Sequence, residues 1–238
     1  MTNETMKTGT MLWRSNAGRG AAYTKTELLV TLAVVAVLAA LVIAPLSVVR
    51  AKTRLKVCMA NLQQVGRATL LFAADHGARL PGLIQTQSGD PWWWYKEEIK
   101  GNVGLTGPSS PNDRVFACPL DRGYSDSTPF CKSPRFDYSS YVFNGVTLFG
   151  TPNIAGWELP AVNQPGRTLL VMEWPAHAPL SWHRSKTGRA NAPFYRDAES
   201  VVAFADGRVD LVKIYYDGYN PAYTRDPIPG YEYKYSGN

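Results

Sequence analysis

The feature that most constrains this chain is a run without a single charged side chain, from Leu28 to Val49. Its only polar side chains are Thr31 and Ser47, and it contains one proline, Pro45. A helix rises about 1.5 Å per residue, so a run of this length spans a hydrocarbon layer roughly 30 Å thick. It is longer than the ~7–15-residue apolar core of a removable signal peptide. The run therefore predicts one membrane-spanning helix.

The same helix is expected to continue beyond the uncharged run. Apolar residues recur in steps of three and four from Leu55 to Phe72, which is the period of an amphipathic helix. Gly77 and Pro81 then supply a stop. We therefore predict one helix from residue 24 to about residue 75, apolar on all sides at first and amphipathic in its second half.

Loops and short strands are expected after Pro81, because the chain holds 20 glycines and 17 prolines. The stretch 90–100 predicts a short helix. Asp206-Gly207 is a two-residue type I′ hairpin signal. Strands are predicted in four apolar segments, namely 139–145, 168–174, 200–205 and 208–216. The sequence thus predicts an α+β fold in which a long N-terminal helix packs on a small antiparallel sheet with long loops.

The helix and the hairpin are expected to pack on each other, because neither can bury its apolar face alone. Alternation along the strand places Val201, Ala203 and Ala205 on one side and Val202 and Phe204 on the other. We expect Phe204 to be the residue that meets the helix.

The cysteines indicate an oxidising compartment. Cys118 and Cys131 are thirteen positions apart in a loop-rich stretch, which suits a disulfide. Cys58 belongs to the inward-facing stripe of the helix and is expected to stay reduced as a small apolar core residue. A C-x12-C spacing without a second such pair does not point to zinc.

The net charge of +6 does not indicate a nucleic-acid partner, because the basic residues are scattered and no nucleic-acid motif is present. The densest basic group, residues 50–56, directly follows the uncharged run and suits a headgroup-facing or solvated position. The sequence contains no nucleophile motif and no Gly-rich phosphate loop, so we do not expect this protein to be an enzyme.

Three groups of residues are candidate binding sites. Glu173, His177 and His183 lie close in sequence, but two prolines between them prevent a regular presentation, so no metal is expected. Asp206 is explained first by its turn; calcium held by Asp206, Asp210 and Asp217 is the alternative, although the usual loop spacing is missing. The tryptophans favour core or interface anchoring, with stacking on a ligand or partner as the alternative; they are Trp92, Trp93 and Trp94.

The stretch YTKTELLVTLAVVAVLAAL, residues 23–41, resembles the processing and methylation segment of type IV prepilins and type II secretion pseudopilins. Aligning Glu27 with the family's glutamate makes Tyr23 the new N-terminus and Ala22 the residue before the cut, where the family has glycine. RVFACPLD, SSYVFNG and VVAFADGRVDLV resemble later landmarks of a prepilin-like subfamily with a C-terminal motif of His, nine residues, then Asp-Gly. Arg196 stands in place of that histidine.

The resemblance implies a domain order. Residues 1–22 are expected to be a cytoplasmic leader, 23–49 a transmembrane and assembly helix, and 50–238 a periplasmic pilin-like domain in which the helix continues to about 76. It also implies cleavage by prepilin peptidase. The protein is then expected to cross the inner membrane once, or to be part of an extracellular filament. The expected function is a structural subunit of a type II secretion pseudopilus or type IV pilus-like filament, whose partners are copies of itself and other pilin-like subunits.

Two alternatives stay open at this point. Glu27 either pairs with the α-amino group freed by cleavage, its own or a neighbour's, or acts only as an acidic residue at the helix start. The chain is either cut and assembled, or it is an uncut, membrane-anchored periplasmic module that binds glycans or a protein partner through the tryptophans. The N-terminus of protein taken from its native membrane distinguishes the last two.

Overall fold

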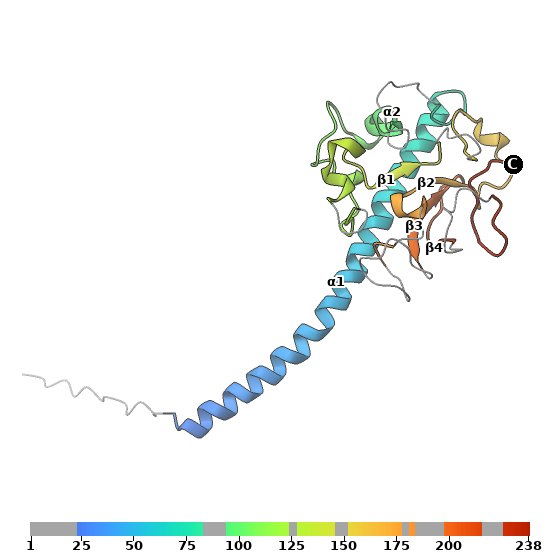
Figure 1. Cartoon of the computed structure of the whole chain (residues 1–238). Helices are drawn as coiled ribbons and strands as arrows, with labels where there is room; N and C mark the ends of the chain where they lie inside the picture. Colours follow the sequence, from blue (N-terminus) through green and yellow to red (C-terminus); the bar gives the residue numbers. More distant parts are fainter. Residues whose placement is uncertain are drawn as a thin grey trace, which may run out of the picture. The chain divides into compact units, whose positions relative to one another are not determined.

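The structure is a computed structural model of the whole chain, shown in Figure 1. It describes residues 23–82, 94–123, 128–145, 152–177, 181–183, 198–215 and 226–238, except for the side chains of 42–48 and 177. The chain divides into two compact units, residues 1–47 and 48–238, and each is described by itself.

Helix α1 runs from Lys25 to Asp75, as the sequence predicted. In the second unit its buried residues include Cys58, Leu62, Val65 and Thr69, which recur in steps of four and three and so form one face. Over the residues whose side chains are described, the structure contains no helix with the length and apolar character needed to cross a membrane. The membrane-spanning segment therefore stays a prediction.

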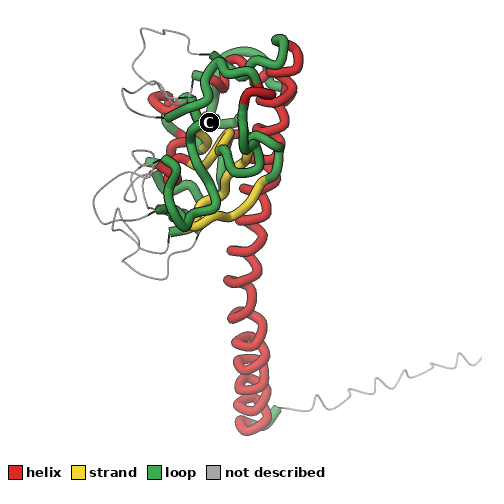
Figure 2. Tube along the Cα trace, turned by 90° about the vertical axis from the view of Figure 1, so that its right-hand side faces the viewer, coloured by secondary structure: helices red, strands yellow, loops and turns green. Residues whose placement is uncertain are grey.

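The second unit contains a four-stranded antiparallel sheet in the order β1-β2-β3-β4. Its strands are β1 (Tyr141–Phe143), β2 (Leu169–Glu173), β3 (Glu199–Phe204) and β4 (Val209–Lys213). Each lies within a predicted segment or extends one residue beyond it. Figure 2 shows the strands beside the part of α1 that belongs to this unit. The mixed α+β class is therefore confirmed.

Short helices connect these elements. Helix α2 (Tyr95–Ile99) confirms the short helix predicted in 90–100. The other short helices are of the 3-10 type: η1 (Lys100–Val103), η2 (Arg114–Phe116), η3 (Phe130–Lys132), η4 (Pro134–Phe136), η5 (Leu159–Ala161) and η6 (Trp174–His177).

The helix packs on the small-residue face of β3. Val201 and Ala203 share one core with the buried face of α1, whereas Phe204 belongs to a second core on the opposite face of the sheet. A Cβ placed on Gly66 of α1 would lie 3.2 Å from the Cβ of Ala203, so the two backbones approach closely. The predicted contact between Phe204 and the helix is wrong, because this approach leaves no room for an aromatic ring.

The C-terminal segment 226–238 covers the Phe204 face. Ile228, Tyr233 and Tyr235 are buried in the same cluster as Phe204. The Tyr235 hydroxyl donates to the carbonyl of Ala176 at 2.9 Å, and Leu169 of β2 donates its N–H to the carbonyl of Lys234 at 2.9 Å. This segment is therefore an ordered arm that completes the second core.

The hairpin turn differs from the predicted type. Phe204 donates its N–H to the carbonyl of Arg208, so the loop consists of Ala205, Asp206 and Gly207. Gly207 has a φ of 88°, while Asp206 is not among the described non-glycine residues with positive φ. A type I′ turn needs positive φ at both central residues, whereas a three-residue loop with a left-handed glycine forms a bulge of the G1 kind. The predicted hairpin is confirmed, but the predicted type I′ turn is wrong.

The disulfide joins Cys58 and Cys118, whose Cα atoms are 4.9 Å apart, and Cys131 is free. The predicted Cys118–Cys131 bridge and the predicted free thiol at Cys58 are therefore wrong. Cys58 does belong to the inward face of α1, but that face meets the segment carrying Cys118. Proximity along the chain favoured Cys131, whereas the packing of the helix decided the pairing.

We expect Gly66→Val to lower the free energy of unfolding by about 1–3 kcal/mol, the range of overpacking in a filled core. Ala60→Val is the matched control, because Ala60 is exposed on the same helix and should cost only about 0.5 kcal/mol of helix propensity. Urea unfolding of both variants measures the difference. Equal losses would contradict the close contact between α1 and β3.

Thiol labelling of the denatured, unreduced chain should modify one cysteine, and peptide mapping should place the label on Cys131. Cys131→Ser should leave no labelled site, and Cys58→Ser should expose two thiols. The bridge closes a loop between two cysteines that are 60 positions apart in the sequence. Its loss should cost about 4 kcal/mol of stability in the chain-entropy account. A label on Cys58 in the unmodified chain would contradict the observed pairing.

Candidate functional site

The first candidate site is the N-terminal turn of α1, where Thr24 and Glu27 form a capping box. The Thr24 N–H and hydroxyl donate to Oε2 of Glu27 at 2.8 and 2.9 Å, and the Glu27 N–H donates to the Thr24 hydroxyl at 3.2 Å. Such reciprocal bonds satisfy backbone donors that a helix start leaves free. Glu27 therefore caps the start of its own helix, which is the role that the second alternative for this residue gives it.

The capping box lies next to the predicted cleavage position. Tyr23 is 83% exposed, whereas Ala22 lies outside the described residues. Neither bond to Oε2 involves the backbone nitrogen of Tyr23. Removal of the preceding residues would therefore leave the capping box intact and free an amino group one residue before it.

The helical surface that follows the capping box is apolar and exposed on all sides. Between Leu28 and Leu41 the leucines and valines are 52% to 67% exposed. They include adjacent residues such as Leu28, Leu29 and Val30, so they do not form a single stripe. A helix that is hydrophobic all round belongs in an apolar environment. This surface is therefore a candidate for burial against other helices or lipid.

The second candidate site is a buried group of four side chains: Cys58, Cys118, Glu173 and His183, here called the Cys–Glu–His cluster. One ligand atom from each lies within 4.8 Å of all the others. Nε2 of His183 lies 2.7 Å from Oε1 of Glu173, and the side chains are 3% and 0% exposed. Oε2 of Glu173 accepts the N–H of Val201 at 2.9 Å. The site thus combines a buried carboxylate, an imidazole and the disulfide.

Four separate segments build this cluster. Cys58 comes from the inner face of α1, Cys118 from the loop after η2, and Glu173 from the last position of β2. His183 follows Trp182, whose indole N–H donates to the carbonyl of Gly123 at 3.0 Å. The His183 N–H donates to the Ser181 hydroxyl at 3.0 Å. These bonds fix the loop that presents the imidazole to Glu173.

Sequence reasoning found half of this cluster. It paired Glu173 with His183, as the structure does, but the side chain of His177 lies outside the described part of the chain. It missed the two cysteines, because Cys58 is 60 positions from Cys118. The available signal was the placement of Cys58 on the inward stripe of α1, which brings it to whatever the stripe packs against.

Trp94 is directed toward the core. It is half-buried and contacts Phe143 edge-on with ring centroids 6.0 Å apart, as expected of core anchoring; Trp92 and Trp93 lie outside the described residues. Lys96, two residues further along the chain, is fully buried. Its Nζ lies 2.9 Å from Oδ2 of Asp113 and donates to the carbonyl of Asp137 at 2.6 Å.

Ionisation around Lys96 follows from these contacts. Burial alone would raise the pKa of the Asp113 carboxyl, but the Lys96 ammonium and hydrogen bonds from Ser110 outweigh it and hold that pKa below its usual range. The pair thus joins α2, which begins directly after Trp94, to the segment that carries Asp113.

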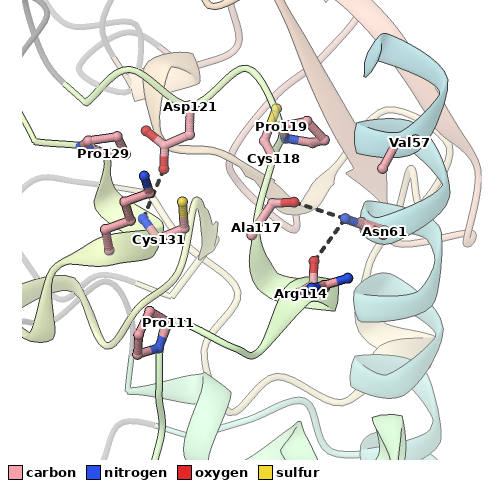
Figure 3. A pocket seen from close by; sticks show the side chains of 11 residues that line it. Val57, Asn61, Pro111, Arg114, Ala117, Cys118, Pro119, Asp121, Pro129 and Cys131 are labelled. Atoms are coloured by element: carbon pink, nitrogen blue, oxygen red, sulfur yellow. Dashed lines mark hydrogen bonds between the residues drawn. The ribbon is translucent and has the colours of Figure 1, made fainter. Parts of the chain in front are cut away.

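A pocket of about 420 Å³ lies beside α1, with Asn61, Asp121 and Cys131 in its lining (Figure 3). Asn61 donates to the carbonyls of Arg114 and Ala117 at 3.0 and 2.9 Å, which ties the pocket wall to the helix. Burial, followed by the nearby Asp121 carboxylate, raises the pKa of the Cys131 thiol to about 11. The thiol is therefore protonated at neutral pH and is a poor nucleophile.

Two of the three candidate calcium ligands, Asp206 and Asp210, bond to Arg208. Oδ1 of Asp206 accepts the Arg208 N–H at 2.9 Å, and Oδ2 of Asp210 pairs with its guanidinium at 2.8 Å. Asp217 lies outside the described residues. A cationic side chain paired with Asp210 competes with calcium for the same oxygens, so this group is better explained by the hairpin.

Comparison with protein-family models, curated proteins and solved structures returned no match to this chain.

Proposed function

We propose that this chain is a structural, non-enzymatic subunit of a pseudopilus or type IV pilus-like filament. The observation that carries the proposal is the surface of α1 between Leu28 and Leu41, which is apolar and exposed on every side. This surface lies directly behind the capping box of Glu27, at the position where the prepilin-like segment places its assembly helix.

Copies of the same helix are the proposed occupants of this surface. Because the exposed residues encircle the helix, one neighbour on one side would leave the other sides in water. A bundle of parallel helices from several subunits surrounds each helix and covers all sides. Before assembly, the uncharged run of residues 28–49 would be held in the inner membrane, with the C-terminal unit in the periplasm.

Glu27 is proposed to set the position of neighbouring helices within the bundle. In an apolar bundle an unpaired carboxylate is strongly disfavoured, whereas an amino group freed at Tyr23 supplies the opposite charge. Oε2 of Glu27 accepts both capping bonds from Thr24, and neither bond involves Oε1. The carboxylate is therefore able to cap its own helix and to face an amino group.

The rival function is an uncut anchored module that binds glycans or a protein through its tryptophans. The placement of Trp94 against Phe143 favours core anchoring for that residue. The rival keeps residues 1–22, so the N-terminus of the mature chain decides between the two functions.

The first test is the N-terminus of protein isolated from its native membrane. We expect mass spectrometry to find Tyr23 as the first residue, and Ala22→Gly to increase the rate of processing, because the peptidase site of this family takes glycine before the cut. A chain that retains residues 1–22 in both forms would remove the main support for assembly and favour the anchored module.

The second test separates the two roles of Glu27. Glu27→Gln keeps a side chain that functions in a capping box but removes its charge, so we expect reduced co-purification with a tagged wild-type copy. Thr24→Ala removes the cap at a cost of about 1 kcal/mol of helix stability but keeps the charge, and should co-purify normally. If Thr24→Ala fails and Glu27→Gln co-purifies as wild type does, Glu27 acts only as a helix-start residue.

A further inference from the structure

The structure assigns a second chemical state to the Cys–Glu–His cluster: we infer that, once its disulfide is reduced, the four side chains bind one Zn²⁺ ion. The ligands are the two thiolates, the imidazole of His183 and the carboxylate of Glu173. This inference does not depend on the proposed function, because it concerns only the core of the C-terminal unit.

The geometry of the cluster fits a tetrahedral ion. Zinc–sulfur bonds of ~2.3 Å and zinc–nitrogen or zinc–oxygen bonds of ~2.0–2.2 Å place tetrahedral ligand atoms about 3.3–3.8 Å apart. The four ligand atoms here already lie within 4.8 Å of one another. Reduction releases the two sulfur atoms from their bond, so they are free to separate to the spacing that a metal requires.

The donor set and its charge also suit zinc. Two thiolates, one carboxylate and one neutral imidazole around Zn²⁺ give a net charge of −1, the same as in a Cys₃His structural site. Glu173 is completely buried, and a cation beside it would offset the cost of that burial. Oε2 of Glu173 already accepts a hydrogen bond from the N–H of Val201. In metal sites, hydrogen bonds of this kind to a ligating side chain hold it in the orientation that the metal needs.

His183 supplies an independent indication. Its Nε2 faces Glu173, while its Nδ1 is buried and has no hydrogen-bond partner among the described residues. Buried polar atoms without a partner are rare and call for an explanation. A metal bound through Nδ1 would supply the missing partner, whereas a metal bound through Nε2 would replace the contact of that nitrogen with Glu173.

The cluster is also held in place by the fold before any metal arrives. Cys58 lies on α1 and Glu173 on β2, which are the helix and a strand of the same core. Sites on rigid elements keep their ligands close to the binding geometry. A bound ion would therefore join the same segments as the disulfide, and add β2 and the loop of residues 181–183 to the crosslink.

The two states are linked by a balanced exchange. A phosphine reductant takes one oxygen atom from water and becomes a phosphine oxide, and its two electrons with the two water protons convert the disulfide into two thiols. Binding of Zn²⁺ then releases two protons as the thiols become thiolates. In a reducing compartment such as the cytosol, thiols such as glutathione, or dithiol proteins, supply the same two electrons and are oxidised to disulfides.

The test uses the full chain, treated with a water-soluble phosphine and then titrated with Zn²⁺ against a chromophoric chelator. We expect one ion per reduced chain and an affinity at least 100-fold above that of the unreduced chain. Co²⁺ in place of Zn²⁺ should give the sulfur-to-cobalt absorption of thiolate ligands. Cys131→Ser should bind as the unmodified reduced chain does, because that thiol is outside the cluster.

The variants Cys58→Ser, Glu173→Gln and His183→Ala should each lower the affinity of the reduced chain more than tenfold. Failure of the reduced chain to bind Zn²⁺, or equal affinity in Cys58→Ser, would overturn the proposal. A variant that does not fold is replaced by a measurement on the unmodified chain: Zn²⁺ should slow diamide-driven return of the Cys58–Cys118 bridge at least tenfold. An unchanged rate would also overturn it.

Discussion

The close approach of α1 to β3, at Gly66 and Ala203, decides how the C-terminal unit is built. Because a glycine faces an alanine there, the helix lies close to the sheet and its inner face becomes the centre of one core. Phe204, the largest apolar residue of the same strand, lies on the other face. That face needs a separate cover, which the C-terminal arm with Tyr233 and Tyr235 provides.

The same contact determines the chemistry at the centre of the unit. Four residues before Leu62, the inner face of α1 presents Cys58, and the sheet presents Glu173 at the end of β2. A buried carboxylate is costly unless other groups satisfy it, and here the imidazole of His183 and the N–H of Val201 do so. The disulfide to Cys118 then fastens the long loop segment to the helix.

Much of this fold was predictable, because the strands and the helix depend on local patterns. The alternation in 200–205 shows that β3 has two apolar faces, but not which element covers each face. The lone glycine in α1 is a sequence signal for a close approach to another element, and the structure shows that this element is β3 at Ala203. The cysteine pairing and the Cys–Glu–His cluster depend on contacts between distant segments, which no local pattern encodes.

The turn type of the hairpin shows the same limit at a smaller scale. Asp-Gly suits both a two-residue turn and a three-residue loop whose last residue is a left-handed glycine. The choice depends on which residues pair, and Phe204 pairs with Arg208. Arg208 also lies over the ring of Phe204, 4.0 Å from its centroid, and forms an ion pair with Asp210. Side-chain packing at the hairpin end thus favours the longer loop.

The two roles of Glu27 are compatible because they make different demands on the carboxylate. Capping requires an acceptor for the Thr24 N–H, and a neutral amide supplies that as well as a carboxylate does. Pairing with an amino group requires the negative charge itself. A negative charge at the first turn is also favoured by the positive end of the helix dipole, so the isolated subunit tolerates it. The capping box therefore keeps the charged group ordered at the head of an apolar surface before any neighbour arrives.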